Sequence, residues 1–490
     1  MAMPPELQDK LCLLIREFYT QNAASAYDEN GNIIKMFQKG ILGVVGGTVD
    51  NLTYRYFSSS NKLSDVSEAT PVDNKLGDFT DNHSGSNDYG YDVNGNLITD
   101  LNKRLNGTTG TDLTSGGAIT YNFLNLPSVI AVKNVNGSSK GTITYIYDAA
   151  GNKLEKRTNE TALSKQTITT YLGGFVYENN VLQFFGHEEG RVRWTLVNGM
   201  NAFVYDYFIK DHLGNVRMVL TEEQKKDMYP AATMETAQAA TEELLYANLN
   251  ATRDNKPKGY PNDSYTNPNN KVTKTNGTVN KIGPSIILKV MAGDQFNIRV
   301  SSWYKKNGAN PVNPKSITSD LVANLINSLT GVGGPVHGAI TSMQLQNNGV
   351  ISATATSFLN TQPAPGTTKP KAYLNWILLD EQFKLVSGSS SAEQVGNDQE
   401  FKVHVKSNLP VTKNGYLYVY VSNETPNVDV FFDNLQVTHI HGALLEETHY
   451  YPFGLTMAGI SLKAVGTLEN KYKFGGKELQ ANEFSDNSGI

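Results

Sequence analysis

The sequence predicts a mainly β protein: a sheet of repeated hairpins, interrupted by an inserted β-sandwich of the jelly-roll type, with a few short helices. Three observations indicate this class. A five-residue turn signature returns four times in the first half of the chain. The composition favours strands and tight turns, with 25 Tyr, 19 Phe and 43 Gly. In the second half, short segments rich in β-branched and aromatic residues alternate with polar loops.

The turn signature consists of an Asp, two variable residues, a Gly and an Asn. Gly supplies a positive φ, and the short polar side chains of Asp and Asn can close a turn between two strands. A Tyr precedes the Asp in the first three copies, and Lys210 takes that place in the fourth. Four copies of one turn indicate a repeated unit, so we assign these residues a structural role. They are Tyr27, Asp28, Gly31, Asn32, Tyr91, Asp92, Gly95, Asn96, Tyr147, Asp148, Gly151, Asn152, Asp211, Gly214 and Asn215.

The spacing between successive signatures leaves room for about three hairpin-sized units each. Residues 52–56, 119–123 and 143–147 alternate Tyr or Phe with other residues, which places aromatic rings on one face of a strand. The stretch 27–220 is therefore predicted to be one hairpin sheet. Before it, residues 1–26 carry apolar side chains at helical spacing and are predicted to form a linker helix.

The Tyr-Asp-x-x-Gly-Asn turns resemble the YD (tyrosine-aspartate) repeat of bacterial Rhs proteins, the B/C components of Tc toxins and animal teneurins. Residues 211–217, and residues 450–454 followed by 471–480, resemble the Rhs repeat-associated core. The resemblance implies a shell of coiled sheet that, in complete members, encloses a C-terminal toxin used in intercellular competition. The chain stops before the end of that core, so we expect a curved sheet segment without the cargo, and no catalytic residue is carried over.

Residues 221–440 are predicted to be a guest domain. In uninterrupted members of the family the two core motifs lie close together, whereas here Arg217 and Tyr451 are far apart in the sequence. A hairpin tip tolerates such an insertion, because its two chain ends lie side by side. Residues 430–437 resemble the closing strand of galactose-binding-like jelly rolls, a fold of carbohydrate-binding modules. The repeat sheet is then predicted to resume over residues 441–490.

Four aromatic residues of the guest domain are candidates for sugar binding: Trp303, Tyr304, Tyr373 and Trp376. Aromatic rings in a sandwich usually pack in the core. Strand alternation nevertheless turns one of each adjacent pair outward, where it could stack on a sugar ring. A cell-surface adhesin that binds glycans through the guest domain is therefore the alternative to the shell function.

His439, His441 and His449 form the only histidine cluster in the sequence, with Glu446 and Glu447 between them. Alternation puts the first two on one strand face, where they could be metal ligands of a metal-dependent enzyme, a third hypothesis. The simpler interpretation is that they face solvent at the seam between the guest domain and the sheet. We predict no metal site and no cofactor. The turn aspartates likewise lack the Glu that ends an EF-hand loop, so turn closure is expected instead of calcium binding.

Composition disfavours several other functions. The net charge of −5 offers no basic field for nucleic acid. Cys12 is the only cysteine, which excludes an intrachain disulfide and Cys-based metal sites. The sequence shows neither a transmembrane segment nor a signal peptide, although the resemblance implies a secreted or cell-surface protein. No phosphate loop, nucleophile elbow or zinc-protease motif occurs, which predicts that the chain is not an enzyme.

Overall fold

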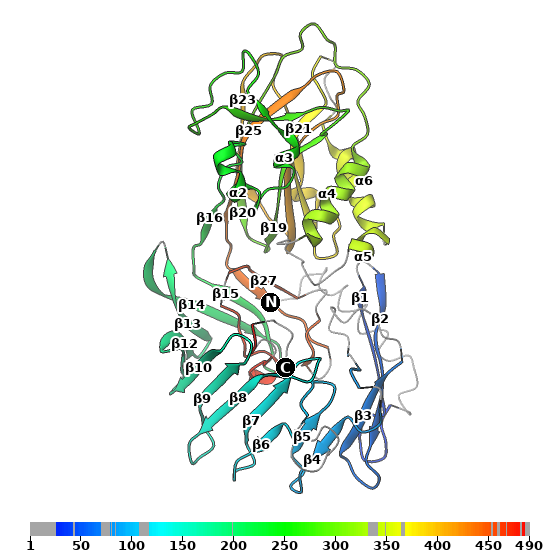
Figure 1. Cartoon of the computed structure of the whole chain (residues 1–490), viewed down its shortest axis with the longest axis vertical. Helices are drawn as coiled ribbons and strands as arrows, with labels where there is room; N and C mark the ends of the chain where they lie inside the picture. The colour runs from blue at the N-terminus through cyan, green and yellow to red at the C-terminus, as the bar shows by residue number, and fades with distance from the viewer. Residues whose placement is uncertain are drawn as a thin grey trace.

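The computed structural model of the chain is mainly β, with several antiparallel sheets and a few short helices, and it confirms the predicted fold class. Figure 1 shows a sandwich above a broad curved sheet. The linker helix predicted for residues 1–26 lies outside the described residues, except for Ala26. The structure describes residues 26–42, 45–69, 79, 81–83, 85–106, 117–197, 199–331, 342–347, 349–363, 368–451, 454–457, 461–466, 468–480 and 483–485.

The largest sheet has twelve strands in the order β27-β26-β15-β14-β13-β12-β11-β10-β9-β8-β7-β6. From β6 to β15 each strand pairs antiparallel with the next one along the chain, as expected for consecutive hairpins. The strands are β6 (Ile119–Tyr121), β7 (Pro127–Lys133), β8 (Ser139–Tyr147), β9 (Lys153–Glu160), β10 (Lys165–Leu172), β11 (Phe175–Glu178), β12 (Val181–His187), β13 (Gly190–Val197), β14 (Met200–Lys210), β15 (Val216–Thr221), β26 (Leu444–Glu447) and β27 (Leu462–Lys463).

Two small sheets, formed by strands that precede β6 in the chain, continue the curve of the large sheet beyond β6 (Figure 1). One contains β1, β2 and β3, and the other contains β4 and β5. Strand β3 contacts β4, and β5 contacts β6, although no hydrogen-bonded ladder joins these pairs among the described residues. The strands are β1 (Lys35–Leu42), β2 (Val45–Tyr56), β3 (Leu63–Glu68), β4 (Tyr89–Tyr91) and β5 (Leu97–Asp100).

The chain leaves the twelve-stranded sheet after β15 and returns to it at β26. These two strands are antiparallel neighbours, with Met218 opposite Glu447. The backbone N–H of Thr221 donates to the carbonyl oxygen of Ala443 at 2.7 Å, so the two chain ends meet at the tip of one hairpin. The described residues between them form the sandwich, its helices and its connecting strands. The insertion therefore leaves the order of the repeat strands undisturbed.

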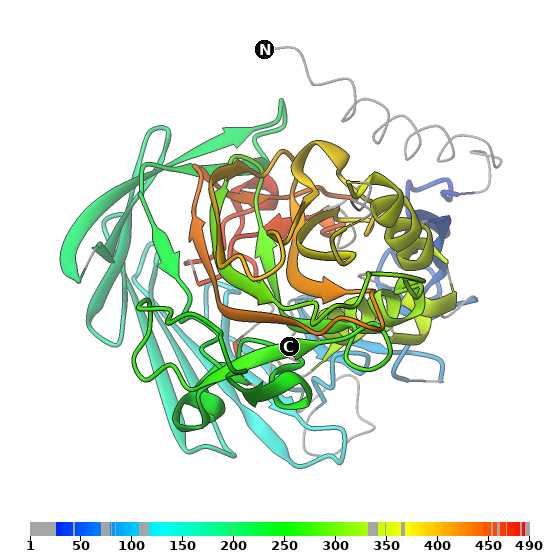
Figure 2. The ribbon, with the colours of Figure 1, turned by 90° about the horizontal axis from the view of Figure 1, so that it is seen from above.

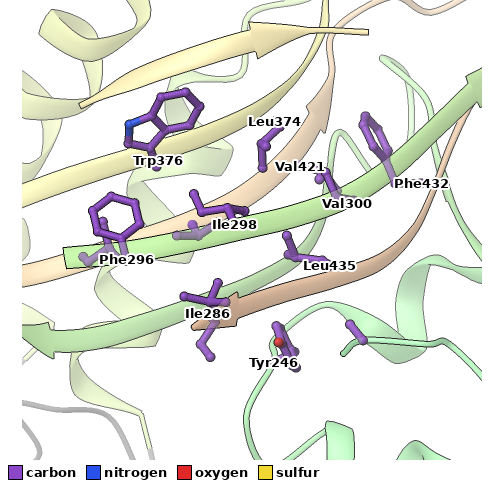
Figure 3. Close-up of a cluster of buried hydrophobic side chains, with 14 of the residues drawn as sticks. Tyr246, Ile286, Phe296, Ile298, Val300, Leu374, Trp376, Val421, Phe432 and Leu435 are labelled. Carbon is purple, nitrogen blue, oxygen red and sulfur yellow. The ribbon is translucent and has the colours of Figure 1, made fainter. Parts of the chain in front are cut away.

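The sandwich consists of two antiparallel sheets that enclose an apolar core (Figure 3). One sheet has six strands, β17-β18-β25-β20-β23 with β16 also paired to β25, and the other has the order β19-β24-β21-β22. Phe296 and Ile298 from the first sheet face Leu374 and Val421 from the second. The strands are β16 (Lys226–Met228), β17 (Arg253–Asn255), β18 (Lys271–Thr275), β19 (Ile282–Val290), β20 (Gln295–Tyr304), β21 (Ala372–Asp380), β22 (Ser391–Gln394), β23 (Lys402–Pro410), β24 (Gly415–Asn423) and β25 (Val430–Ile440).

A layer of helices covers the outer face of the four-stranded sheet. Leu325 and Phe358 from two of these helices pack with Tyr418 and Tyr420 of β24 in a second buried cluster. Both faces of this sheet are therefore buried, which explains why β21 and β24 read as nearly continuous apolar runs. The helices are α4 (Thr318–Thr330), α5 (Ser342–Asn347) and α6 (Val350–Thr361), and two single-turn helices, α2 (Ala239–Glu242) and α3 (Leu249–Thr252), lie before them in the chain.

Candidate functional site

The four turn signatures share one geometry. In the third copy, the carboxylate of Asp148 accepts the backbone N–H groups of Ala150 at 2.9 Å and Asn152 at 2.8 Å, and the side-chain amide of Asn152 at 2.8 Å. Gly151 adopts a φ of 86°, and its N–H donates to the Asp148 carbonyl. The amide of Asn152 lowers the pKa of Asp148, as the matching Asn does for Asp28 and Asp92. The carboxylate's acceptor positions are thus engaged in closing the turn.

A fifth turn of the same design departs from the strict signature. The aromatic alternation of residues 119–123 indicated a hairpin unit here, but sequence reasoning did not assign its turn residues. Asn122 takes the place of the Asp, and its side-chain oxygen accepts the N–H groups of Leu124 and Leu126. Asn125 takes the place of the Gly with a φ of 56°. Asn is the non-glycine residue that best tolerates this conformation. An Asn-x-x-Asn pattern between two strand-like runs was the available signal.

Tyrosine hydroxyls connect neighbouring hairpins. Each acceptor is the backbone carbonyl of the residue that directly follows a turn in the adjacent hairpin. This repeated contact fixes how far successive turns are staggered along the sheet edge. The donor–acceptor pairs are Tyr56–Ile33 at 2.8 Å, Tyr121–Leu97 at 2.7 Å, Tyr147–Pro127 at 3.0 Å and Tyr450–Val216 at 2.8 Å.

The last of these pairs spans the guest domain. Tyr450 follows the insertion and Val216 precedes it, yet they make the contact that other hairpins make with their immediate predecessor. Tyr147, one of the signature tyrosines, is a donor in the series. Tyr27 instead forms an isolated bridge with Ile33 and remains half exposed.

The concave face of the large sheet holds a C-terminal segment, of which residues 468–480 and 483–485 are described. Figure 2 shows the sheet curving around this part of the chain, which is drawn in red. The segment has little regular structure of its own; a 3-10 turn at Phe474–Gly476 is its one named element among the described residues. It crosses the strands, with contacts from β15 and β13 back to β8, and the backbone N–H of Val216 on β15 donates to the carbonyl oxygen of Lys473 at 3.3 Å. Its first anchor is Arg191 of β13, whose guanidinium donates to the carbonyl oxygens of Leu468 at 2.6 Å and Glu469 at 3.2 Å.

Glu478 anchors the middle of the segment. Its carboxylate binds Lys153, the Nζ of Lys156 at 3.2 Å and the hydroxyl of Tyr171 at 3.0 Å. Lys156 also pairs with Glu483 at 2.9 Å, and these two side chains are only 3% and 5% exposed. Burial raises the pKa of Glu478, but the two lysines and the tyrosine hydroxyl outweigh it, and the net shift is downward. A buried network of this kind is costly to break at any one partner.

The end of the segment adds an apolar contact. Phe484 is buried in a cluster with Ile143 and Tyr145 of β8. Gly141 makes this approach possible, because a Cβ at that position would lie 2.5 Å from the Phe484 ring. The concave face therefore holds an irregular polypeptide by backbone hydrogen bonds, ion pairs and apolar packing together.

The prediction of an outward aromatic sugar platform is wrong. Trp303, Tyr304, Tyr373 and Trp376 are all buried, none more than 6% exposed. Tyr304 and Trp376 point into the core between the two sheets. Trp303 and Tyr373 do point away from it, as alternation requires, but further layers cover them. The ring of Trp303 meets the ring of Tyr260 edge to face, with 5.7 Å between the ring centroids, and Tyr373 belongs to the cluster under the helices.

The expectation that the histidine cluster faces solvent is also wrong. His439, His449 and Glu446 are all buried. His449 pairs with Glu447 at 2.8 Å, separate from the other two histidines. The rings of His439 and His441 lie 4.0 Å apart between centroids and are tilted by 30°, and each ring contacts an aspartate from elsewhere in the chain.

Those aspartates are Asp294 and Asp227, and sequence reasoning missed both. Asp294 lies 2.6 Å from His439, and Asp227 lies 2.8 Å from His441. The pairing of β16 with β25 sets Asp227 opposite His439. Such long-range pairing leaves no local signal in the sequence.

Comparison with known proteins identifies no family. No protein-family model matches the chain, and no curated protein matches it. Among solved structures it is similar to the C-terminal family 22 carbohydrate binding module of Clostridium thermocellum Xyn10B, at 9% sequence identity and a TM-score of 0.20, over 49% of this chain and 100% of that one. A likeness this slight carries no argument about function. Among the described residues, no helix has the length and apolar character needed to cross a membrane.

Proposed function

We propose that this chain is a non-catalytic scaffold of the Rhs/YD-repeat type, whose curved sheet holds polypeptide along its concave face. The observation that carries this proposal is the path of residues 468–480 and 483–485. They cross the sheet from β15 and β13 to β8 and are held by Arg191, Lys153 and Lys156. By this proposal the protein acts outside the cell or at its surface. In a longer protein the same face would continue around a C-terminal toxin cargo.

Two physical features support polypeptide as the occupant of this face. The guanidinium of Arg191 donates to main-chain carbonyls, a contact that any peptide sequence can supply. The guanidinium of Arg191 is also held in place by the sheet, since its Nε donates to the buried carboxylate of Asp206 at 2.9 Å. Arg193 binds that carboxylate as well, at 2.6 Å, which keeps the charge of Asp206 compensated. The concave face thus presents hydrogen-bond donors that are already ordered, so that binding a peptide costs little side-chain entropy.

Limited proteolysis of the full chain tests whether the segment is held. Trypsin should cut slowly at Lys471 and Lys473, and Glu478→Gln should accelerate these cuts, because it removes the carboxylate that both lysines of β9 contact. A loss of 1.4 kcal/mol in the free energy of local opening raises the cleavage rate about tenfold. The matched control is Glu178→Gln, an exposed position at the end of β11. Fast cleavage in the parent chain, or equal rates in both variants, would argue against the proposal.

Glycan binding by the guest domain is the second candidate. Its two-sheet sandwich supports it, whereas burial of the four predicted rings removes the platform that suggested it. A glycan array probed with the full chain distinguishes the two functions. Saturable binding to one glycan class favours the adhesin. A toxin domain encoded directly downstream, with an immunity gene beside it, favours the shell.

A further inference from the structure

Four side chains converge at the neck of the guest domain, where its two connecting strands lie side by side. Asp227 lies on β16, directly opposite His439 of β25. His441 follows two residues after His439, directly beyond the end of β25. Asp294 lies in the turn between β19 and β20 and is tied to the same place, because it accepts the N–H of Gly442 at 2.6 Å. Three separate segments of the chain thus supply the cluster.

The geometry of the cluster is compact. One ligand atom each from Asp294, His439 and His441 all lie within 4.8 Å of one another. A carboxylate oxygen of Asp294 lies 2.6 Å from Nε2 of His439, and a carboxylate oxygen of Asp227 lies 2.8 Å from Nε2 of His441. Asp294 and His439 are 1% and 3% exposed. Asp294 and His439 are therefore held in a nearly water-free place, whereas the Asp227 side chain beside His441 is 36% exposed.

The charge of this site favours a cation. Burying an ionised carboxylate is costly unless a positive charge compensates it. The Nζ of Lys225 lies 3.2 Å from Asp227 and compensates that carboxylate in part. Asp294 forms its ion pair with His439, which is positive only when protonated. A divalent ion would neutralise the site without requiring a buried imidazolium.

We propose that the neck of the guest domain binds a divalent transition-metal ion of the zinc type, with His439, His441 and Asp294 as ligands and with Asp227, which lies 2.8 Å from His441 outside that group, moving in as the fourth. Imidazole nitrogens and carboxylate oxygens coordinate zinc at about 2.0–2.2 Å in tetrahedral sites, which puts ligand atoms about 3.3 Å apart. The 2.6 Å and 2.8 Å pairs need to open by less than about 1 Å to reach that spacing. The ion would replace the protons that these pairs now share.

The position of the site suggests what the ion would do. Its ligands come from β16, from β25 and from the β19–β20 turn, so coordination would tie both connecting strands to the base of the sandwich. A metal ion at this place would fix the orientation of the guest domain relative to the large sheet. This proposal departs from the expectation of no metal site that the sequence alone supported, and it is independent of the proposed scaffold function.

Zinc titration of the full chain tests the proposal. The protein is made without a polyhistidine tag, treated with a chelator and titrated with zinc chloride by calorimetry. We expect one ion per chain. X-ray absorption of the zinc-loaded protein should show two imidazoles with oxygen ligands at about 2.0–2.2 Å. Absence of stoichiometric binding, or a zinc environment without imidazole, overturns the proposal.

Two variants test whether zinc binds at these residues. His441→Ala and Asp227→Asn are chosen because their side chains are the less buried members, and circular dichroism checks that both variants fold. Removing a ligand should weaken zinc binding by at least the ~10–100-fold that loss of a supporting group costs. His212→Ala, an exposed histidine in the fourth turn, should leave the affinity unchanged. Equal affinity in His441→Ala and the parent chain contradicts the proposal, and the absorption measurement on the parent decides the matter if the variants do not fold.

Discussion

At the scale of single residues, the repeat units depend on turn positions that only certain residue types can fill. Gly31, Gly95, Gly151 and Gly214 all have φ values between 82° and 86°. Their turn aspartates are closed by the same hydrogen bonds in all four copies. Because this chemistry is local, it could be predicted from the sequence.

Gly214→Ala tests the conformational requirement. Its φ of 82° strains any L side chain, while no atom lies within 4 Å of the place that a Cβ would occupy, so the cost is conformational alone. We expect a loss of about 1–2 kcal/mol in the free energy of unfolding. A shift of the urea midpoint at constant slope measures it. Gly186→Ala on β12 is the control, since its surroundings are equally open and its φ is not positive; equal losses in both variants would contradict the account.

Glu478 predicts a pH dependence. Its folded pKa lies below its ordinary value of 4.5, so its contribution to stability is present above 4.5 and is lost as the pH falls through the folded pKa. The amides of residues 468–480 should thus exchange hydrogen slowly near neutral pH and lose protection in acid. Mass spectrometry, corrected for intrinsic exchange, follows this change. Glu478→Gln should flatten the dependence, and an unchanged profile in that variant counts against the role of this carboxylate.

At the scale of elements, sequence predicted what is encoded within a hairpin and missed what depends on a neighbouring layer. The strand order follows from consecutive hairpins, and the insertion was predicted from the long stretch of sequence between residues 211–217 and residues 450–454. Trp303 and Tyr373 were misplaced because the residues that cover them come from distant parts of the chain. The pairing of Lys156 with Glu478 joins residues more than three hundred positions apart, so no local pattern reveals it.

Tyr450→Phe tests the contact between successive hairpins. The variant removes the hydroxyl that reaches the Val216 carbonyl across the insertion. We expect a loss of about 0.5–1.5 kcal/mol in unfolding free energy, the usual net value of one hydrogen bond. Tyr27→Phe, at a half-exposed ring, should have little effect. If the two variants have the same urea midpoint, the hydrogen bonds from tyrosine hydroxyls to neighbouring hairpins do not stabilise the sheet.

At the scale of the whole molecule, the sandwich is inserted between β15 and β26, two strands of the large sheet that pair directly with each other. The hydrogen bond of Thr221 to Ala443 joins the two chain ends at 2.7 Å. Replacing residues 222–442 by a short turn should therefore leave the twelve-stranded sheet folded. The deletion removes Trp303 and Trp376, so the fluorescence of Trp194 on β13 then reports on the sheet alone. A blue-shifted emission that moves cooperatively to red in urea is expected, whereas a solvent-like spectrum without denaturant shows that the sheet needs its guest.

The central claim is that the concave face holds residues 468–480 and 483–485, and zero-length cross-linking of the unmodified chain tests it most directly. A carbodiimide joins a lysine to a carboxylate only where the two are in contact. Lys371 and Glu424 in the sandwich, 2.8 Å apart and of comparable burial, are the internal reference. We predict that mass spectrometry finds Lys153 joined to Glu478 at a yield similar to the reference pair. The reference link without any Lys153–Glu478 link would contradict the claim.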